Sequence, residues 1–167
     1  LEQLTWKGSA CSDERHPFAL DTLTSLTKLE LDAVTVADDL LFPPNVRVLA
    51  LKFRMEGRPF DLNVLTALTG LASLDVFAVS MDVSLDLARL TTLSAVDTNG
   101  LSVSALPTSL ERCCVALDGD FDFSGMTRLK ALHVGFNTPT KVTFPTQLEE
   151  LRVVKGKWAR ATPRTFS

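Results

Sequence analysis

The chain has 167 residues, of which 46% are hydrophobic and 22% charged, and its formal net charge is −3. These proportions are typical of about one folded domain and exclude a disordered tail. No apolar run approaches the roughly 20 residues that a membrane-spanning helix needs, so we expect no membrane insertion. Leucine occupies 28 positions and tyrosine none. Such a bias indicates a repeated motif.

The charges are divided unevenly along the chain. Residues 1–140 contain 11 basic and 18 acidic side chains, whereas residues 141–167 contain 6 basic and 2 acidic ones. Nucleic-acid binding requires a basic surface, so the acidic body argues against a nucleic-acid partner. We predict a repeat domain over residues 1–158 and a solvated basic tail over residues 159–167.

A frame of the form Leu-x-x-Leu-x-Leu recurs eight times when similar residues are allowed at its apolar positions. Its starts are separated by 25, 20, 25, 22, 17, 19 and 19 residues, with a mean near 21. A steady period of this length predicts a stacked repeat array. In chain order the frames are residues 1–6, 26–31, 46–51, 71–76, 93–98, 110–115, 129–134 and 148–153.

Two kinds of segment precede the frames. Four frames follow an apolar trio that ends three residues earlier, and three follow an apolar residue joined to Pro. Pro fixes φ and opposes a helix, so the Pro-type segments are expected to be extended or 3₁₀. The trio type allows one short helical turn. The trios are Phe18-Leu20-Leu23, Leu62-Leu65-Leu68, Leu85-Leu87-Leu90 and Phe121-Phe123-Met126, and the pairs are Phe42-Pro43, Leu106-Pro107 and Phe144-Pro145.

Each frame is expected to form a short strand. Side chains alternate along a strand, so the fourth and sixth frame positions point inward and the third, fifth and seventh point outward. One such strand cannot bury its apolar face alone, but parallel stacking of successive strands builds a continuous core. An amphipathic helical bundle is the alternative, because Leu-x-x-Leu is also a helical spacing. The Pro-containing connections and the β-branched residues at the strand ends argue against it.

The Leu spacing resembles that of the leucine-rich-repeat superfamily over nearly the whole chain. The resemblance implies an α/β fold: a right-handed horseshoe solenoid of about eight repeats, with a parallel sheet on its concave face and short 3₁₀, helical or extended backs. The usual Asn or Cys at the ninth frame position is missing in all repeats but one, which is similar to irregular short-repeat members from bacteria and protists. That position holds Ser9, Val34, Arg54, Val79, Leu101, Asp118, Asn137 and Gly156.

Members of this superfamily generally bind partners on the concave face, so the resemblance implies a non-catalytic scaffold for protein or peptide recognition, without a cofactor. A basic or amphipathic partner would suit the acidic half of the face. A structural spacer array within a larger surface or cytoskeletal protein is the alternative function. The outward positions predict a partner-binding surface that comprises Glu30, Asp32, Lys52, Asp75, Phe77, Asp97, Asn99, His133 and Arg152.

Asp75 and Asp97 are expected to be neighbours on adjacent strands. Like charges this close oppose each other's ionisation, so the pair should meet a basic group or share a proton. It also motivates a third function, a solenoid hydrolase that uses both carboxylates. His133 and Arg152 would lie two and three strands beyond Asp97, roughly 10 and 15 Å away, out of hydrogen-bond reach. We therefore predict no enzymatic activity.

Three cysteines and two histidines are too few and too irregularly spaced for a disulfide scaffold or a zinc site. Cys113 occupies an inward position and is expected to be a core residue. Cys114 then points outward beside His133 and is expected to be a weakly reactive thiol. Trp6 and Trp158 are expected to pack on the core.

The compartment is left open by the sequence, because a cytoplasmic, a cell-surface and a secreted protein are equally compatible with three cysteines. The chain begins at Leu1 rather than at Met and shows no signal peptide. The first frame starts at the same residue. We expect the chain to be part of a longer one, in which further repeats or a capping segment cover the first strand.

Overall fold

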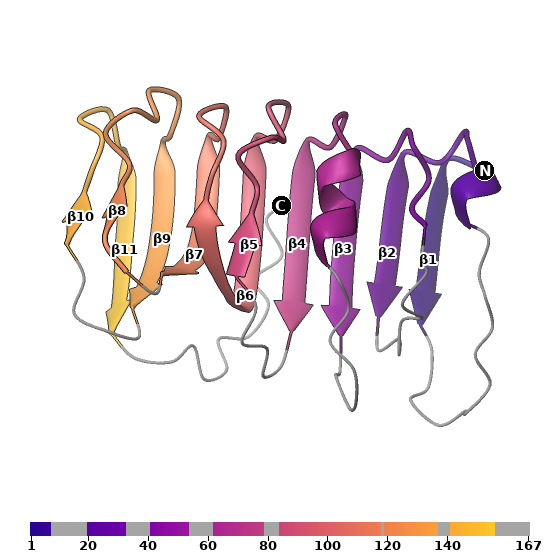
Figure 1. Ribbon diagram of the computed structural model, residues 1–167, viewed down its shortest axis with the longest axis horizontal. Helices are drawn as coiled ribbons and strands as arrows, with labels where there is room; N and C mark the ends of the chain where they lie inside the picture. The colour runs from indigo at the N-terminus through magenta and orange to yellow at the C-terminus, as the bar shows by residue number, and fades with distance from the viewer. Residues whose placement is uncertain are drawn as a thin grey trace.

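The computed structural model describes residues 1–7, 20–32, 41–53, 62–78, 84–117, 119–136 and 141–155. Its main feature is a parallel sheet in which strands from successive turns of the chain lie side by side (Figure 1). The fold is therefore a parallel-sheet solenoid. The strands follow the order β1 (Gln3–Lys7), β2 (Lys28–Asp32), β3 (Val48–Phe53), β4 (Ser73–Ala78), β6 (Ala95–Ala105), β7 (Arg112–Leu117), β9 (Ala131–Phe136) and β11 (Glu150–Lys155).

The strands pair at the same position of every frame. The fourth and sixth side chains point inward in the alternation expected of a strand, and all those on β2 to β9 are buried. This register confirms the predicted inward positions and excludes a helical bundle over these frames. From one end of the sheet to the other, the paired fourth-position residues are Leu4, Leu29, Leu49, Leu74, Val96, Cys113, Leu132 and Leu151.

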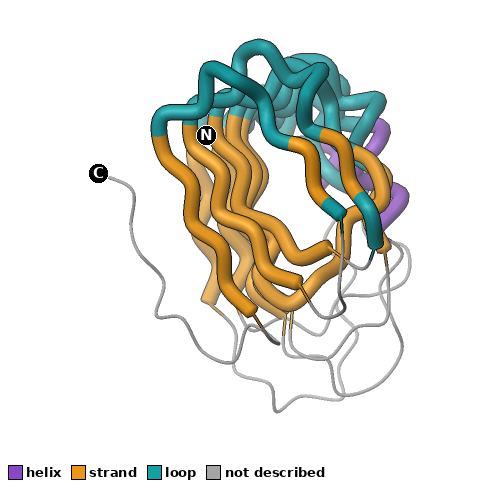
Figure 2. The backbone as a smooth tube through the Cα atoms, turned by 90° about the vertical axis from the view of Figure 1, so that its left-hand side faces the viewer, coloured by secondary structure: helices purple, strands orange, loops and turns teal. Residues whose placement is uncertain are grey.

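The segments that precede the frames form the opposite wall of the core (Figure 2). Two of them contain 3₁₀ helices, η1 (Leu20–Thr22) and η2 (Leu62–Ala67). Three others contain short strands, β5 (Ser84–Asp86), β8 (Phe121–Asp122) and β10 (Val142–Thr143). Strands β8 and β10 form a separate parallel pair, and β5 pairs with the far half of β6. The core thus lies between two walls.

The short helical turn that the trio-type segments allow forms in two of the four, as η1 and η2, and the other two contain strands instead. Residues 62, 65 and 68 are spaced by three, the period of the 3₁₀ helix that forms there. Residues 85 and 87, like residues 121 and 123, are spaced by two, the period of a strand. Among the described residues the helical part of the expected α/β class is limited to η1 and η2.

An Asp side chain turns the chain after each of the strands β5 and β8. Asp86 Oδ1 accepts a hydrogen bond from the N–H of Ala88 at 3.0 Å, and Asp122 Oδ1 accepts one from Ser124 at 2.9 Å. A carboxylate that bonds the backbone two residues later forms an Asx turn, which replaces the strand ladder. These turns direct the chain toward the next frame.

Strand β6 is longer than its neighbours and irregular. Asp97 pairs with Cys114, but the next pair along β7 is Ser102 with Ala116. The four residues 98–101 of β6 therefore lie opposite the single residue Val115, a large bulge that bends the strand. Beyond the bend, β6 also pairs with β5, which extends the same sheet onto the opposite wall.

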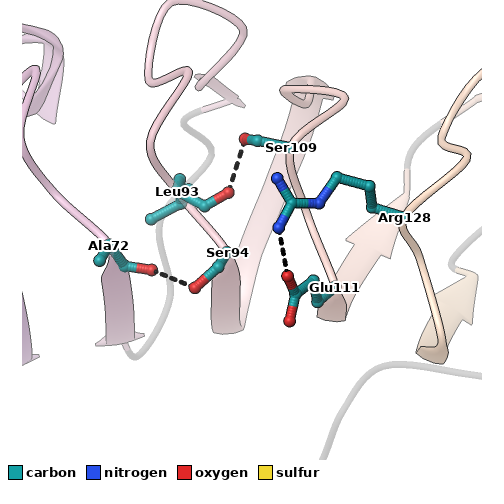
Figure 3. A network of polar contacts seen from close by, with 6 residues as sticks. All are labelled: Ala72, Leu93, Ser94, Ser109, Glu111 and Arg128. Atoms are coloured by element: carbon teal, nitrogen blue, oxygen red, sulfur yellow. Dashed lines mark hydrogen bonds and ion pairs between the residues drawn. The ribbon is translucent and has the colours of Figure 1, made fainter.

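Polar side chains directly before the frames tie successive turns together. Four of them donate a hydrogen bond to a backbone carbonyl of the preceding turn, and Ser94 does the same from a frame's second position (Figure 3). These bonds satisfy carbonyls in the turns that enter the strands. We call them rungs. They are Asn45 to Thr24 (2.7 Å), Thr92 to Leu71 (2.8 Å), Ser109 to Leu93 (2.7 Å) and Gln147 to Met126 (2.6 Å).

The first and last strands expose apolar side chains that would be buried in the middle of the sheet. Trp6 was expected to pack on the core, but 42% of its surface is exposed. Its Cα partner is Leu31 on β2, and β1 is the first strand in the order of the sheet. Leu151 and Val153 of the last strand are likewise 46% and 54% exposed. Trp158 lies outside the described residues.

Candidate functional site

The outer face of the long sheet carries the fifth and seventh side chains of the frames. Residues at the fifth position form one in-register row across the strands, which brings the predicted acidic and basic residues into a defined order. We call this surface the outer face. The fifth-position row reads Thr5, Glu30, Ala50, Asp75, Asp97, Cys114, His133 and Arg152.

Near the first strands of the outer face, an ion pair joins β2 and β3. Lys52 Nζ lies 3.6 Å from Glu30 Oε1, and both side chains are partly buried. Asp32 is the Cα partner of Lys52 and is also half-buried. Lys52 therefore has two acidic neighbours from β2, and its charge is largely balanced on that side.

Asp75 and Asp97 are Cα partners on β4 and β6. Burial raises the pKa of Asp75, Lys52 opposes the shift and Glu30 adds to it. Burial and the charge of Asp75 raise the pKa of Asp97 to about 6, against opposing effects of Cys114 and His133. The two neighbours predicted from the sequence therefore lie on adjacent strands, and the pKa values of both carboxyls are raised.

The two adjacent cysteines lie on opposite sides of β7, as expected. Cys113 is buried in the core and Cys114 is partly exposed on the outer face. Burial, the charge of Asp97 and a hydrogen bond with that carboxylate raise the pKa of Cys114 to about 12. A thiol with so high a pKa is a poor nucleophile at neutral pH. The site therefore offers Cys114 as a hydrogen-bond donor to Asp97.

The far end of the row forms a cluster around Glu150. Its Oε1 lies 3.0 Å from His133 Nε2 and 3.2 Å from Arg152 Nε. Glu150 occupies a third frame position, which also points outward, but it was not among the predicted site residues. Its spacing of two from Arg152 is the signal that places both on one face of a strand.

Phe77 is the one large aromatic side chain predicted for the outer face, and 38% of its surface is exposed. Its Cα partners are Lys52 on β3 and Asn99 on β6. The side chain of Asn99 lies outside the described part of the structure. Phe77 follows Asp75 by two residues on β4, so an apolar surface borders the carboxylate pair.

The seventh frame position does not stay outward across the whole sheet. Ala116 and Gly135 hold the seventh position of their frames, which the alternation predicts to point outward, but both are buried. Ala116 pairs with Ser102 beyond the bulge of β6. There the strands bend toward the opposite wall, and the alternation of the flat sheet is lost. The outer face is consequently narrower at β7 and β9 than at β2 to β4.

The described residues contain no group of three or more His, Cys, Asp or Glu side chains that could hold a metal ion. No helix within the described ranges is long and apolar enough to cross a membrane.

Two shallow hollows lie between turns where the chain enters the strands, outside the acidic row. One is lined by Glu111, Arg112, Lys130, Ala131, Glu149 and Glu150, and the other by Thr24, Ser25, Thr27, Pro44, Asn45, Arg47 and Gly70.

Comparisons of the chain with protein-family models, with curated proteins and with solved structures found no match. A proposal for the function therefore rests on the residues of the outer face.

Proposed function

We propose that the chain is an irregular leucine-rich-repeat scaffold that recognises a protein or peptide partner on the outer face without catalysis. The outer face would then be the concave face of a right-handed horseshoe of about eight repeats. The proposal rests on the Leu frames and on the in-register acidic row bordered by Phe77. The docking residues are Glu30, Asp32, Lys52, Asp75, Phe77, Asp97, Asn99, His133 and Arg152.

The carrying observation is the pair of acidic side chains, Asp75 and Asp97, at the centre of the outer face. Lys52 is held by Glu30, and His133 is held by Glu150. Among the described residues neither Asp75 nor Asp97 forms an ion pair, so their charge is available to a partner. The exposed ring of Phe77 beside them offers the apolar contact that aromatic residues contribute to protein interfaces. A segment with Lys or Arg next to an apolar residue fits this arrangement.

A peptide library displayed on phage tests the proposal. We expect selection on the wild-type protein at low salt to enrich peptides that combine Lys or Arg with an apolar residue, and the enriched peptides to lose most of their binding to the triple variant Asp75→Asn, Phe77→Ala, Asp97→Asn. A matched variant, Asp21→Asn with Leu41→Ala, removes an acid and an exposed apolar side chain outside the outer face. It should bind normally.

The spacer function predicts the opposite outcome of the same selection. Either no peptide is enriched, or the enriched peptides bind the triple variant as well as the wild type. Circular dichroism and the melting temperature of each variant show whether the fold is retained, so that a loss of binding is not mistaken for unfolding.

A hydrolase remains the second candidate because one observation favours it. Adjacent strands are about 4.8 Å apart, which is close to the roughly 5 Å between the two carboxyl groups of retaining glycosidases. Asp97 would supply the acid because its pKa is raised to about 6. Such an enzyme would hydrolyse a glycan from a polysaccharide panel, and its turnover would vanish with either Asp75→Asn or Asp97→Asn. The bonding of His133 and Arg152 to Glu150 leads us to rank this function below recognition.

A further inference from the structure

The centre of the outer face contains two carboxylates that face each other across one strand spacing. Asp75 on β4 and Asp97 on β6 are Cα partners and point to the same side of the sheet. Two ionised carboxylates in this arrangement repel each other, and a shared proton relieves the repulsion.

Among the described residues no cationic side chain forms an ion pair with Asp75 or Asp97, although Lys52 lowers the pKa of Asp75 and His133 that of Asp97. The titratable and charged groups that face the pair are Glu30 on β2, Lys52 on β3, Cys114 and Arg112 on β7, and His133 on β9. Lys52 lies 3.6 Å from Glu30, and His133 lies 3.0 Å from Glu150. Each of these two side chains already has a carboxylate partner on the side away from the pair.

Cys114 adds a polar contact on one side of the pair only. Its thiol is hydrogen-bonded to Asp97, and this contact lowers the pKa of that carboxyl, although burial and the charge of Asp75 outweigh it. Asp75 is the more exposed of the two residues. The two carboxyls consequently have different surroundings, and the proton is held preferentially at Asp97.

We propose that Asp75 and Asp97 share one proton in mildly acidic solution and release it near neutral pH, so that the centre of the outer face changes from one negative charge to two. The consequence for binding rests on the proposed function. A basic segment that docks beside Phe77 meets the full charge only above the titration of the pair. Recognition by this face is therefore weaker at pH 5 than at pH 7.5.

The proton itself is tested without any partner. Carbon-13 NMR of the Asp side-chain carboxyls, recorded from pH 3 to pH 8.5, should show one titration of the pair near pH 6, assigned with the single variants. In Asp75→Asn the Asp97 titration should move to lower pH because the neighbouring charge is gone. Titration of both carboxyls near the ordinary value of about 3.9 would overturn the proposal.

The effect on binding is tested with hexalysine as the probe, at low salt, by NMR shift titration at pH 5.0 and pH 7.5. The probe is acetylated at its N-terminus, so its only amines are those of lysine, which stay protonated at both values because lysine titrates near pH 10.4. The loss of one surface charge should make binding about three-fold weaker at pH 5.0. Equal affinity of the wild type at the two pH values would overturn the proposed pH dependence of binding.

The double variant Asp75→Asn, Asp97→Asn separates the pair from other titrating groups. The variant retains both histidines, so any pH dependence of binding that it still shows measures the contribution of the histidines. We expect its affinity ratio between the two pH values to approach one. Absence of hexalysine binding at both values, together with a carboxyl titration near pH 6, would contradict the proposed docking function while supporting the shared proton.

Discussion

The hydroxyl of Ser109 donates a hydrogen bond of 2.7 Å to the backbone carbonyl of Leu93, one turn earlier in the solenoid. Thr92 makes the corresponding bond to Leu71, from the same position directly before a frame. Asn45 and Gln147 also donate from that position, but to carbonyls that lie before the preceding frame. The rungs therefore satisfy carbonyls where the chain enters the strands.

Replacing Ser109 by Ala should lower the free energy of unfolding by about 1 kcal/mol, because the Leu93 carbonyl then loses a partner in a partly buried turn. Urea unfolding monitored by circular dichroism measures the change. Thr108→Ala removes the neighbouring hydroxyl, which is exposed, and should have little effect. Equal effects of the two substitutions would contradict the role of the rung.

Thr98 occupies a sixth frame position in register with Val76, and its hydroxyl is buried without a hydrogen-bond partner. Replacing it by Val keeps the shape and removes the desolvated hydroxyl, so we expect the unfolding free energy to rise by about 1 kcal/mol. Thr143→Val, at an exposed strand position, is the matched control and should change little. A loss of stability in Thr98→Val would show that the hydroxyl has a favourable role.

The alternation within each frame was sufficient to predict the sheet register and the acidic row. A shift of one residue would expose Leu29, Leu49 and Leu74 together, so burial of one face fixes the pairing. Asp75 and Asp97 follow from that register, because both hold the fifth position of adjacent frames. Periodicity carries this information since every strand of the sheet obeys the same rule.

The features that the sequence did not predict depend on neighbours outside the frame. Ala116 is buried because β6 bends opposite β7. The alternation of apolar and polar residues in the two strands does not predict this bend. Trp6 is exposed because β1 is the first strand in the sheet order. Glu150 contacts His133 and Arg152 by side-chain reach across strands, which a list of fifth and seventh positions omits.

The raised pKa of Asp97 predicts that stability falls as the pH rises. The folded pKa is about 6 and the unfolded value about 3.9, so between these values the folded state binds more protons than the unfolded state. The unfolding free energy should therefore decrease as the pH rises from about 4 to about 6, and stay low above that.

Asp97→Asn should remove this loss of stability at high pH. Relative to the wild type, the unfolding free energy of the variant should be higher at pH 7.5 than at pH 5.0, by on the order of 1 kcal/mol after allowance for partial exposure. Urea unfolding of both proteins at the two pH values gives the double difference. Asp32→Asn, on the same face, is the matched control. The same pH dependence in Asp97→Asn as in the wild type would assign it to other groups.

Cys114 should react slowly with iodoacetamide although it lies on the outer face. Its pKa is raised to about 12, so at pH 8 the thiolate needed for reaction is scarce, and alkylation should be at least about 100-fold slower than for a free cysteine. Slow labelling would therefore not argue against the outward register. Asp97→Asn should speed the reaction, because it removes the negative charge that opposes the thiolate.

The measurement is mass spectrometry in a Cys11→Ser background, with Cys114→Ser giving the baseline from buried Cys113. Fast labelling of Cys114 in the folded protein, or a rate that Asp97→Asn leaves unchanged, would contradict the coupling of the two side chains.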